Sequence, residues 1–314
     1  MNGSVSRHQA TAMADPEEAS IAIRQRGPFD LPLSLAAAAS FLPSLGLVPT
    51  VLRQAVRVNG AATVLEIRQP AKTTPLIRAS AVPTLERARL RELVRWLISA
   101  DLDLQPFYRL ASSDPIMRPA IEALHGLKPL RPASLFEMLV IAITEQQLSL
   151  AAAFQIRSRL VSRFGSPIAD LWLFPEPEAL AGAHLIDLRA CGLSERKAEY
   201  IRSLARHVAD GQLRLDNLKR QSDAETREIL LRYRGFGEWS IQYILVRGLG
   251  RSDALPSADV GLRRVLGMYF ADGRRLKPEE LEAAMSPFQP FRGLAAFYLS
   301  VHWRLRRGVQ AMPT

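Results

Sequence analysis

The hydrophobic pattern of this chain changes its period once, near Ser112, and this change constrains the fold more than any other feature. Residues 54–58 and 63–68 alternate apolar and polar side chains around Asn59 and Gly60, which predicts a β-hairpin. A third strand is expected at 76–82. Beyond Ser112 the apolar residues recur at helical spacing, and we expect no strand there. The pattern therefore predicts an α+β fold, in which a small antiparallel α+β domain precedes an all-α domain.

Residues that start or end helices divide the chain further. We expect an apolar helix at about 35–42, ended by Pro43, and a basic amphipathic helix at about 84–99 beside the sheet. Helix starts are predicted at three serines that can act as N-caps, namely Ser134, Ser194 and Ser222, and helix ends at Gly165, Gly211 and Gly235. The predicted organisation is a disordered tail at 1–27, the α+β domain at 28–112 and the all-α domain at 113–314.

Composition narrows the classes of function. Lys and Arg number 41 against 31 Asp and Glu, which favours a polyanionic partner such as nucleic acid, although an arginine-rich proteome gives the same excess. The only cysteine, Cys191, excludes an intramolecular disulfide, a four-cysteine zinc site and a cysteine-ligated iron–sulfur cluster. We find no signal peptide and no apolar run near eighteen residues. We therefore expect a soluble cytoplasmic protein without a cofactor.

The segment around Gly235, Phe236 and Gly237 is the most informative motif. A capped helix runs into these residues, and a second helix begins at once with Glu238. Such a turn presents backbone N–H groups and the helix dipole to a phosphate, whatever the base sequence. The glycine spacing alone also fits an ordinary packing corner between helices. We expect Arg234 and Arg263 to add contacts to DNA.

The context of the hairpin carries a family resemblance. A proline-marked loop brings Asp259 to the start of a further helix, and the run from 135 to 303 resembles the helix-hairpin-helix glycosylases. Within them it is most similar to the DNA-3-methyladenine glycosylase II, or alkylbase glycosylase, branch. Three more segments share this resemblance: 141–149 with its Gln-Gln-Leu, the Gly-Leu-Ser start at 192–198, and the Phe-x-Pro-Phe-Arg run at 288–292.

The resemblance implies a fold and a function. It implies a TBP-like amino-terminal domain and a monofunctional DNA glycosylase that flips out and hydrolytically excises alkylated bases, such as 3-methyladenine and 7-methylguanine, in base excision repair. It implies a monomer that acts on double-stranded DNA containing damaged bases, near the bacterial nucleoid and away from membranes. Gln147 or Leu148 would be the wedge that fills the vacated stack. The carbonyls of Tyr233 and Gly235 could hold a structural monovalent cation, with no catalytic metal.

Asp259 is the expected catalytic residue. A carboxylate beside the sugar can stabilise the positive charge that develops as the base departs, and can orient or deprotonate the attacking water. An aspartate at a helix start is also a common N-cap, and Asp259 could do both. Relatives with strand-cleaving activity place a lysine where this chain has Trp239, and no lysine occurs between Lys219 and Lys277. The sequence therefore predicts hydrolysis without lyase activity.

An aromatic base pocket is expected beside this aspartate. Trp239 and Tyr243 lie four residues apart and share a helix face, which suits a positively charged alkylated purine, although both rings could instead fill core. The resemblance adds Phe288 and Trp303 to the pocket. It also shows a departure, because Ser300 stands where that branch has a tryptophan. Two alternatives stay open: a glycosylase for uracil, hypoxanthine or an oxidised purine, and a non-catalytic binder of damaged DNA.

Overall fold

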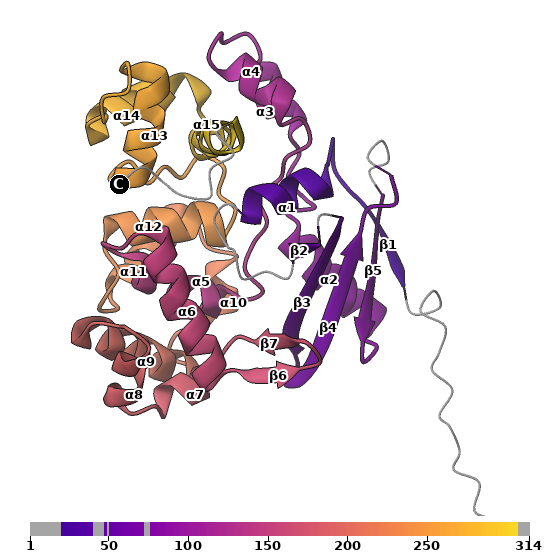
Figure 1. Ribbon diagram of the computed structural model, residues 1–314, viewed down its shortest axis with the longest axis vertical. Coiled ribbons are helices and arrows are strands. Elements are labelled where there is room, and N and C mark those ends of the chain that lie inside the picture. The colour runs from indigo at the N-terminus through magenta and orange to yellow at the C-terminus, as the bar shows by residue number, and fades with distance from the viewer. Residues whose placement is uncertain (1–19, 40–46, 49, 72–75, 307–314) are drawn as a thin grey trace, which may run out of the picture.

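The computed structural model describes residues 20–39, 47–48, 50–71 and 76–306. Its larger sheet is antiparallel throughout and has the strand order β1-β5-β4-β3-β2. The strands are β1 (Ile21–Arg24), β2 (Leu47–Val48), β3 (Val51–Val58), β4 (Ala61–Arg68) and β5 (Leu76–Val82). The sheet lies on one side of the molecule and most helices lie on the other (Figure 1).

The central hairpin of the sheet follows the predicted register. Val58 pairs with Ala61, and the two residues between them, Asn59 and Gly60, have φ values of 50° and 80°. Positive φ at both positions is the geometry that a two-residue hairpin turn requires. The predicted strand at 76–82 is also confirmed as β5.

The two helices predicted beside the sheet are present with shifted ends. They are α1 (Leu31–Ala39) and α2 (Arg87–Leu97), and the end of the first prediction at 40–42 lies outside the described residues. The helix α2 buries Leu90, Val94 and Leu97 against the sheet, as its apolar spacing requires.

The predicted tail at 1–27 extends too far. Residues 1–19 lie outside the described part, but Ile21–Arg24 form β1, which pairs with β5 and buries Ile21 and Ile23. The strand was missed because four residues with two buried side chains give too short an alternation to stand out from a polar context. The sheet thus begins inside the segment that was assigned to the tail. The TBP-like character of this domain stays a prediction.

Helices make up most of the chain after the sheet. The helices before the hairpin motif are α3 (Gln105–Ala111), α4 (Met117–Ala123), α5 (Leu135–Glu145), α6 (Leu150–Phe164), α7 (Pro177–Ala181), α8 (Leu185–Ala190), α9 (Glu195–Ala209), α10 (Leu215–Leu218) and α11 (Asp223–Leu231). Those after it are α12 (Glu238–Tyr243), the π-helical turn η1 (Ile244–Gly248), α13 (Val260–Phe270), α14 (Pro278–Met285), the 3-10 turn η2 (Ser286–Phe288) and α15 (Arg292–Arg306).

The expected helix starts are confirmed in atomic detail. The side chains of Ser134, Ser194 and Ser222 accept hydrogen bonds from backbone N–H groups in the first turns of α5, α9 and α11, and the last forms a full capping box with Glu225. Gly165 ends α6 as predicted. No described helix is both long enough and apolar enough to cross a bilayer.

The carboxyl-terminal domain is not all-α, which corrects the prediction. Strands β6 (Ser166–Ile168) and β7 (Leu171–Leu173) form a hairpin whose turn contains Ala169 and Asp170. It lies against β3 and β4 of the sheet (Figure 1), and Asp170 pairs with Arg53 at 2.6 Å. A two-stranded hairpin is marginal alone, so this one depends on packing with a distant part of the chain that a local sequence pattern cannot show.

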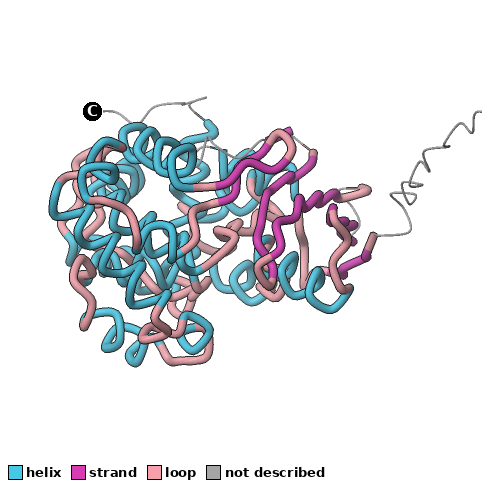
Figure 2. Tube along the Cα trace, turned by 90° about the horizontal axis from the view of Figure 1, so that it is seen from below, coloured by secondary structure: helices cyan, strands magenta, loops and turns pink. Residues whose placement is uncertain are grey.

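Three buried cores organise the described residues. The sheet core lies between the sheet, α1 and α2. The central core surrounds α5 with α6 to α12 and η1, and the C-terminal core joins α3 and α4 to α13, α14 and α15. Phe107 and Tyr108 of α3 pack in that third core, so this helix belongs with the C-terminal helices although it precedes the boundary expected at 112. Figure 2 shows the strands gathered at one end of the molecule.

Candidate active site

The hairpin between α11 and α12 presents an exposed glycine over a buried phenylalanine. Phe236 is 7% exposed in the central core, so only its backbone can reach a ligand. Gly237 is exposed and is the N-cap of α12, where its N–H donates to Ser240 Oγ at 2.9 Å. Glu238 is exposed and pairs with Arg227 at 2.8 Å. The exposed Arg234 places its guanidinium over the Tyr200 ring.

The two predicted pocket aromatics on α12 form a stacked pair. The ring centroids of Trp239 and Tyr243 are 5.3 Å apart with an interplanar angle of 14°, and both residues are half-buried. The indole Nε1–H of Trp239 donates to Asp259 Oδ2 at 2.8 Å. This contact joins α12, which packs in the central core, to the start of α13 in the C-terminal core. The structure thus brings together three of the predicted site residues at the junction of the two cores.

Asp259 is both the N-cap of α13 and a member of this group. Its Oδ1 accepts the N–H of Leu262 at 2.6 Å while Oδ2 accepts the Trp239 indole, and the residue is half-buried. Two donors on different elements therefore fix the plane of the carboxylate. Each oxygen keeps lone-pair capacity for a further partner, so the capping role leaves the group able to act on a ligand.

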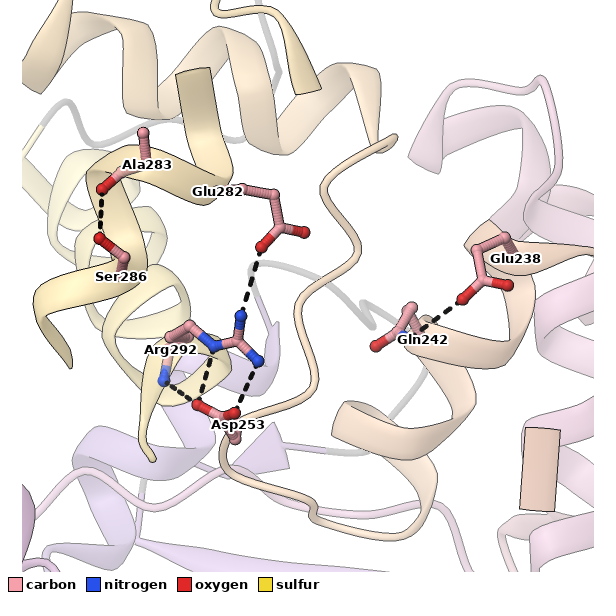
Figure 3. A network of polar contacts seen from close by, with 7 residues as sticks. All are labelled: Glu238, Gln242, Asp253, Glu282, Ala283, Ser286 and Arg292. Atoms are coloured by element: carbon pink, nitrogen blue, oxygen red, sulfur yellow. Dashed lines mark hydrogen bonds and ion pairs between the residues drawn. The ribbon is translucent and has the colours of Figure 1, made fainter. Parts of the chain in front are cut away.

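The loop before Asp259 is anchored to the start of α15. Arg292 donates from Nε and Nη2 to the two carboxylate oxygens of Asp253 at 3.0 and 2.7 Å, and its backbone N–H reaches Oδ1 at 3.2 Å. Figure 3 shows this fork, with Glu282 on the far side of the guanidinium. A Cβ at Gly293 would lie 2.1 Å from the carbonyl oxygen of Ala254, so the helix start also touches the loop backbone. The Phe-x-Pro-Phe-Arg segment therefore supports the position of Asp259.

A buried ion pair lies behind the stacked rings. The Tyr243 hydroxyl donates to Glu145 Oε2 at 2.8 Å, and Arg157 Nη1 donates to Glu145 Oε1 at 3.0 Å. The side chains of Glu145 and Arg157 are each 7% exposed. Burial and the nearby Glu145 carboxylate raise the pKa of Tyr243 far above its usual range, so the hydroxyl keeps its proton.

The predicted wedge loop follows Glu145 directly. Gln147 and Leu148 are both exposed, and Gln147 has a φ of 55° in the left-handed region. Gln146 points the other way, because its Nε2 donates to the carbonyl of Gly235 at 2.7 Å. Lys197 Nζ donates to the carbonyl of Gln146 at 2.5 Å, which ties the loop to α9. The loop is thus held by the hairpin while its tip is left open.

Two arginines surround the polar side of the site. Burial lowers the pKa of Arg304, Arg247 lowers it further, and Asp259 and Tyr243 oppose that shift. Arg304 therefore lies close enough to Arg247, Asp259 and Tyr243 to interact with each of them electrostatically. Arg247 lies over the Phe297 ring at 5.7 Å. Sequence reasoning missed Glu145, Gln146 and Arg304 as members of the site, and of these only Glu145 has a sequence signal, because it is a charged residue at the end of the apolar run of α5.

Three other predicted site residues, Phe288, Trp303 and Arg263, are buried or engaged in other contacts. Phe288 is 2% exposed in the C-terminal core and offers no open ring face, which argues against its predicted stacking role. Trp303 is 7% exposed in the same core, and its pocket role stays a prediction. Arg263 donates from Nη1 to the carbonyl of Leu276 at 3.2 Å, which turns one end of its guanidinium toward the segment before α14, and its contact with DNA stays a prediction. Phe288 was drawn from motif context, which does not report the direction of a side chain.

The structural monovalent cation predicted at the carbonyls of Tyr233 and Gly235 stays a prediction, because each carbonyl oxygen accepts one hydrogen bond and keeps a second lone pair. The carbonyl of Gly235 accepts from Gln146, and that of Tyr233 accepts from Phe236 N–H at 3.4 Å. Among the described residues there is also no group of three His, Cys, Asp or Glu side chains that could hold a metal ion.

Comparisons with known proteins agree with this geometry. Residues 140–290 match the family described as HhH-GPD superfamily base excision DNA repair protein. The chain is 30% identical over 228 residues to a DNA-3-methyladenine glycosylase of Bacillus subtilis, covering 70% of this chain and 74% of the relative. A solved 3-methyladenine DNA glycosylase from Archaeoglobus fulgidus has a TM-score of 0.80 and 26% identity, covering 91% of this chain and 99% of that one.

A second similar solved structure contains DNA. The 3-methyladenine DNA glycosylase of Schizosaccharomyces pombe in complex with abasic DNA has a TM-score of 0.57 and 25% identity, covering 66% of this chain and 98% of that one. The likeness therefore includes a relative that was solved in complex with DNA. This chain belongs to the helix-hairpin-helix superfamily of base excision DNA repair glycosylases, alongside the DNA-3-methyladenine glycosylases.

Proposed function

We propose that this chain is a monofunctional DNA glycosylase that flips alkylated bases, such as 3-methyladenine and 7-methylguanine, out of double-stranded DNA and releases them by hydrolysis. One observation carries the proposal: the Asp259 carboxylate is fixed by two donors directly beside the stacked Trp239 and Tyr243 rings. A flat cationic base has aromatic faces to stack on, and the sugar it leaves has a carboxylate nearby.

The proposed chemistry uses the chain's own carboxylate. As the N-glycosidic bond breaks, its electron pair leaves with the base, and positive charge develops on the sugar. Asp259 stabilises that charge and accepts the proton of the water that attacks the anomeric carbon. A cationic base is already a good leaving group, so modest assistance suffices. The fixed plane of the carboxylate avoids the cost of reorientation during the reaction.

The absence of a lysine near the hairpin in the sequence supports hydrolysis without lyase activity. Trp239 occupies the position of the lysine in strand-cleaving relatives, and the sequence has no lysine from 220 to 276. Lys197 lies near the wedge loop, but its amine donates to the carbonyls of Thr144 and Gln146. A Schiff base requires a free amine at the sugar, which these contacts do not offer.

DNA would be held by the hairpin and opened by the wedge loop. The backbone from Gly235 to Glu238, with Arg234 beside it, is the proposed phosphate contact, and exposed Gln147 or Leu148 is the proposed plug for the vacated stack. The shared partner class is supported by the relative that was solved with abasic DNA.

One observation favours a second substrate class. Ser300 is 7% exposed, and its hydroxyl has no hydrogen-bond partner within the described residues. It lies four residues before Arg304 on α15 and so shares a helix face with a group that interacts with Asp259. A polar wall of this kind suits a neutral base that carries a carbonyl, such as hypoxanthine.

An excision panel tests the proposal. Duplexes bearing 3-methyladenine, 7-methylguanine, hypoxanthine, uracil or oxoguanine are incubated with the wild-type protein, and base release is measured. We expect release of the methylated bases, and no borohydride-trapped adduct on abasic DNA above background. Asp259→Asn should bind the same duplexes and lose nearly all release. Wild-type release by Asp259→Asn would refute the mechanism, and an efficient trapped adduct would refute the absence of lyase activity.

A further inference from the structure

The ion pair behind Tyr243 has no place in the chemistry described so far. Glu145 is the last residue of α5, and its side chain is 7% exposed in the interior of a domain. Burying a charge is costly unless it is paired and hydrogen-bonded. Both oxygens of Glu145 are used: Oε1 accepts from Arg157, and Oε2 accepts from Tyr243. The carboxylate therefore serves a base-pocket residue directly.

The same arrangement occurs on the other ring of the stacked pair. The only polar hydrogen of the Trp239 indole goes to the Asp259 carboxylate, and the only polar hydrogen of the Tyr243 phenol goes to the Glu145 carboxylate, each at 2.8 Å. A donor that bonds to a carboxylate is polarised, so electron density moves from the X–H group into the ring. The negative potential on the two ring faces, which attracts cations, is thereby increased.

We propose that Glu145 is a positioning residue that fixes and polarises Tyr243, and so favours a positively charged base over a neutral base of similar shape. This inference rests on the proposed function, because it assumes that the base stacks on the Trp239 and Tyr243 pair. Arg157 offsets the charge of Glu145, so the pair carries no net charge that could attract a cationic base. The preference for a cationic base therefore arises from the polarised Tyr243 phenol. Glu145 itself touches no substrate.

The position of Glu145 also links the pocket to the wedge loop. Its backbone carbonyl accepts the N–H of Leu148 at 3.4 Å, and the next residue, Gln146, donates to the hairpin carbonyl of Gly235. The residue that orients Tyr243 therefore begins the loop whose tip would enter the stack. Rotation of the phenol away from Glu145 would leave a buried carboxylate oxygen without its donor, which keeps the ring in one orientation.

The test is a selectivity ratio measured on three variants. For wild type, Glu145→Gln, Tyr243→Phe and the double variant, single-turnover excision is measured on duplexes that bear 7-methylguanine, which is cationic, or hypoxanthine, which is neutral. We expect Glu145→Gln to lower the cationic-to-neutral ratio of kcat/KM by about 3- to 10-fold. Tyr243→Phe should lower it similarly, and the double variant should be no lower than Tyr243→Phe alone.

A matched control separates this role from general destabilisation. Glu137 lies two turns earlier on α5 and accepts from the Ala133 N–H at 3.1 Å. Like Glu145 it interacts with Arg157, but it lies about 12 Å farther along the helix axis from the stacked rings. Burial raises the pKa of Glu137 to about 7, so the neutral amide of Glu137→Gln is a mild replacement. This control should leave the selectivity ratio unchanged, even if it lowers the urea midpoint as much as Glu145→Gln does.

The outcomes are distinct. If Glu145→Gln and Glu137→Gln reduce excision of both bases equally, Glu145 is only structural and the inference is wrong. Because Glu145→Gln leaves Arg157 buried without its anion, it could fail to fold. Tyr243→Phe then decides, since an unchanged ratio in that variant also overturns the inference. If the wild-type protein releases neither base, the proposed function itself fails, which is a different result from an unchanged ratio.

Discussion

Replacing each hairpin glycine with alanine should separate the fold from DNA binding. Gly235 has a φ of 99°, and a Cβ there would lie 2.8 Å from Tyr200 Cδ2. A non-glycine residue in this region costs about 1–3 kcal/mol, and displacing a packed ring adds about as much. We therefore expect Gly235→Ala to lower the free energy of unfolding by about 2–6 kcal/mol.

Gly237 should behave in the opposite way. Its φ of −123° is open to any residue, and a Cβ there would have no neighbour within 4 Å. The change should alter the free energy of unfolding by less than about 1 kcal/mol, because a small loss in N-cap quality is offset by a stiffer unfolded chain. The added methyl would stand where a phosphate approaches. Losing a hydrogen bond to a charged group then weakens DNA binding by about 10- to 100-fold.

Two measurements check this pair. Urea denaturation gives stability, and fluorescence anisotropy with an abasic duplex at fixed salt gives affinity. Gly182→Ala is the control, since Gly182 has an ordinary φ and its nearest neighbour to a new Cβ is the Glu178 carbonyl at 3.5 Å. The reasoning is refuted if Gly235→Ala unfolds at the wild-type urea concentration, or if Gly237→Ala is the less stable of the two hairpin variants.

Three further predictions follow from the geometry. Burial lowers the pKa of Lys128 from 10.5 to about 8. Between these two pH values the unfolded chain holds a proton that the folded chain has released, so the free energy of unfolding should rise with pH by up to about 3 kcal/mol. Urea titrations at pH 7.5 and 10 should show this rise in wild type and its loss in Lys128→Met. Arg292→Met should lower kcat/KM for the preferred lesion by about 10- to 100-fold, because the loop before Asp259 loses its anchor. The affinity of this variant for abasic DNA should stay within about twofold of wild type, and unchanged excision would contradict the anchoring role. Phe288→Leu should lower the free energy of unfolding by about 1–3 kcal/mol and leave the ranking of lesions in the excision panel unchanged. A changed ranking would show that Phe288 contributes to the base pocket.

Local signals in the sequence predicted much of this fold. Serine caps at Ser134, Ser194 and Ser222 and the Asn-Gly turn depend on neighbours within four residues, and all are confirmed. The errors arose where structure depends on distant partners. The strand β1 needs β5, and the β6–β7 hairpin needs the sheet, which Asp170 reaches through Arg53 across 117 residues of sequence.

The candidate site shows the same division. Trp239, Tyr243 and Asp259 were predicted from spacing and from a family resemblance, and the structure brings them together. The partner of Tyr243 could not be predicted, because Glu145 is 98 residues away and its charge within an apolar helix gives no direction. Phe288 shows the converse, since a motif can predict that a residue matters without predicting which way its side chain points.

The short segment from Glu145 to Leu148 connects the parts of the site that must act together. Glu145 holds the pocket ring through its side chain, Gln146 holds the hairpin through Gly235, and the open tip at Gln147 and Leu148 faces outward. In the proposed function, the tip fills the stack as a base leaves it, while the proposed phosphate contact holds the duplex. These contacts start from successive residues of one loop. A shift of the loop on DNA would therefore change the contact of Gln146 with the hairpin and the contact of Glu145 with Tyr243 at the same time. Attachment at Glu145 and Gln146 and exposure of Gln147 and Leu148 therefore suit the proposed role of this loop as a wedge.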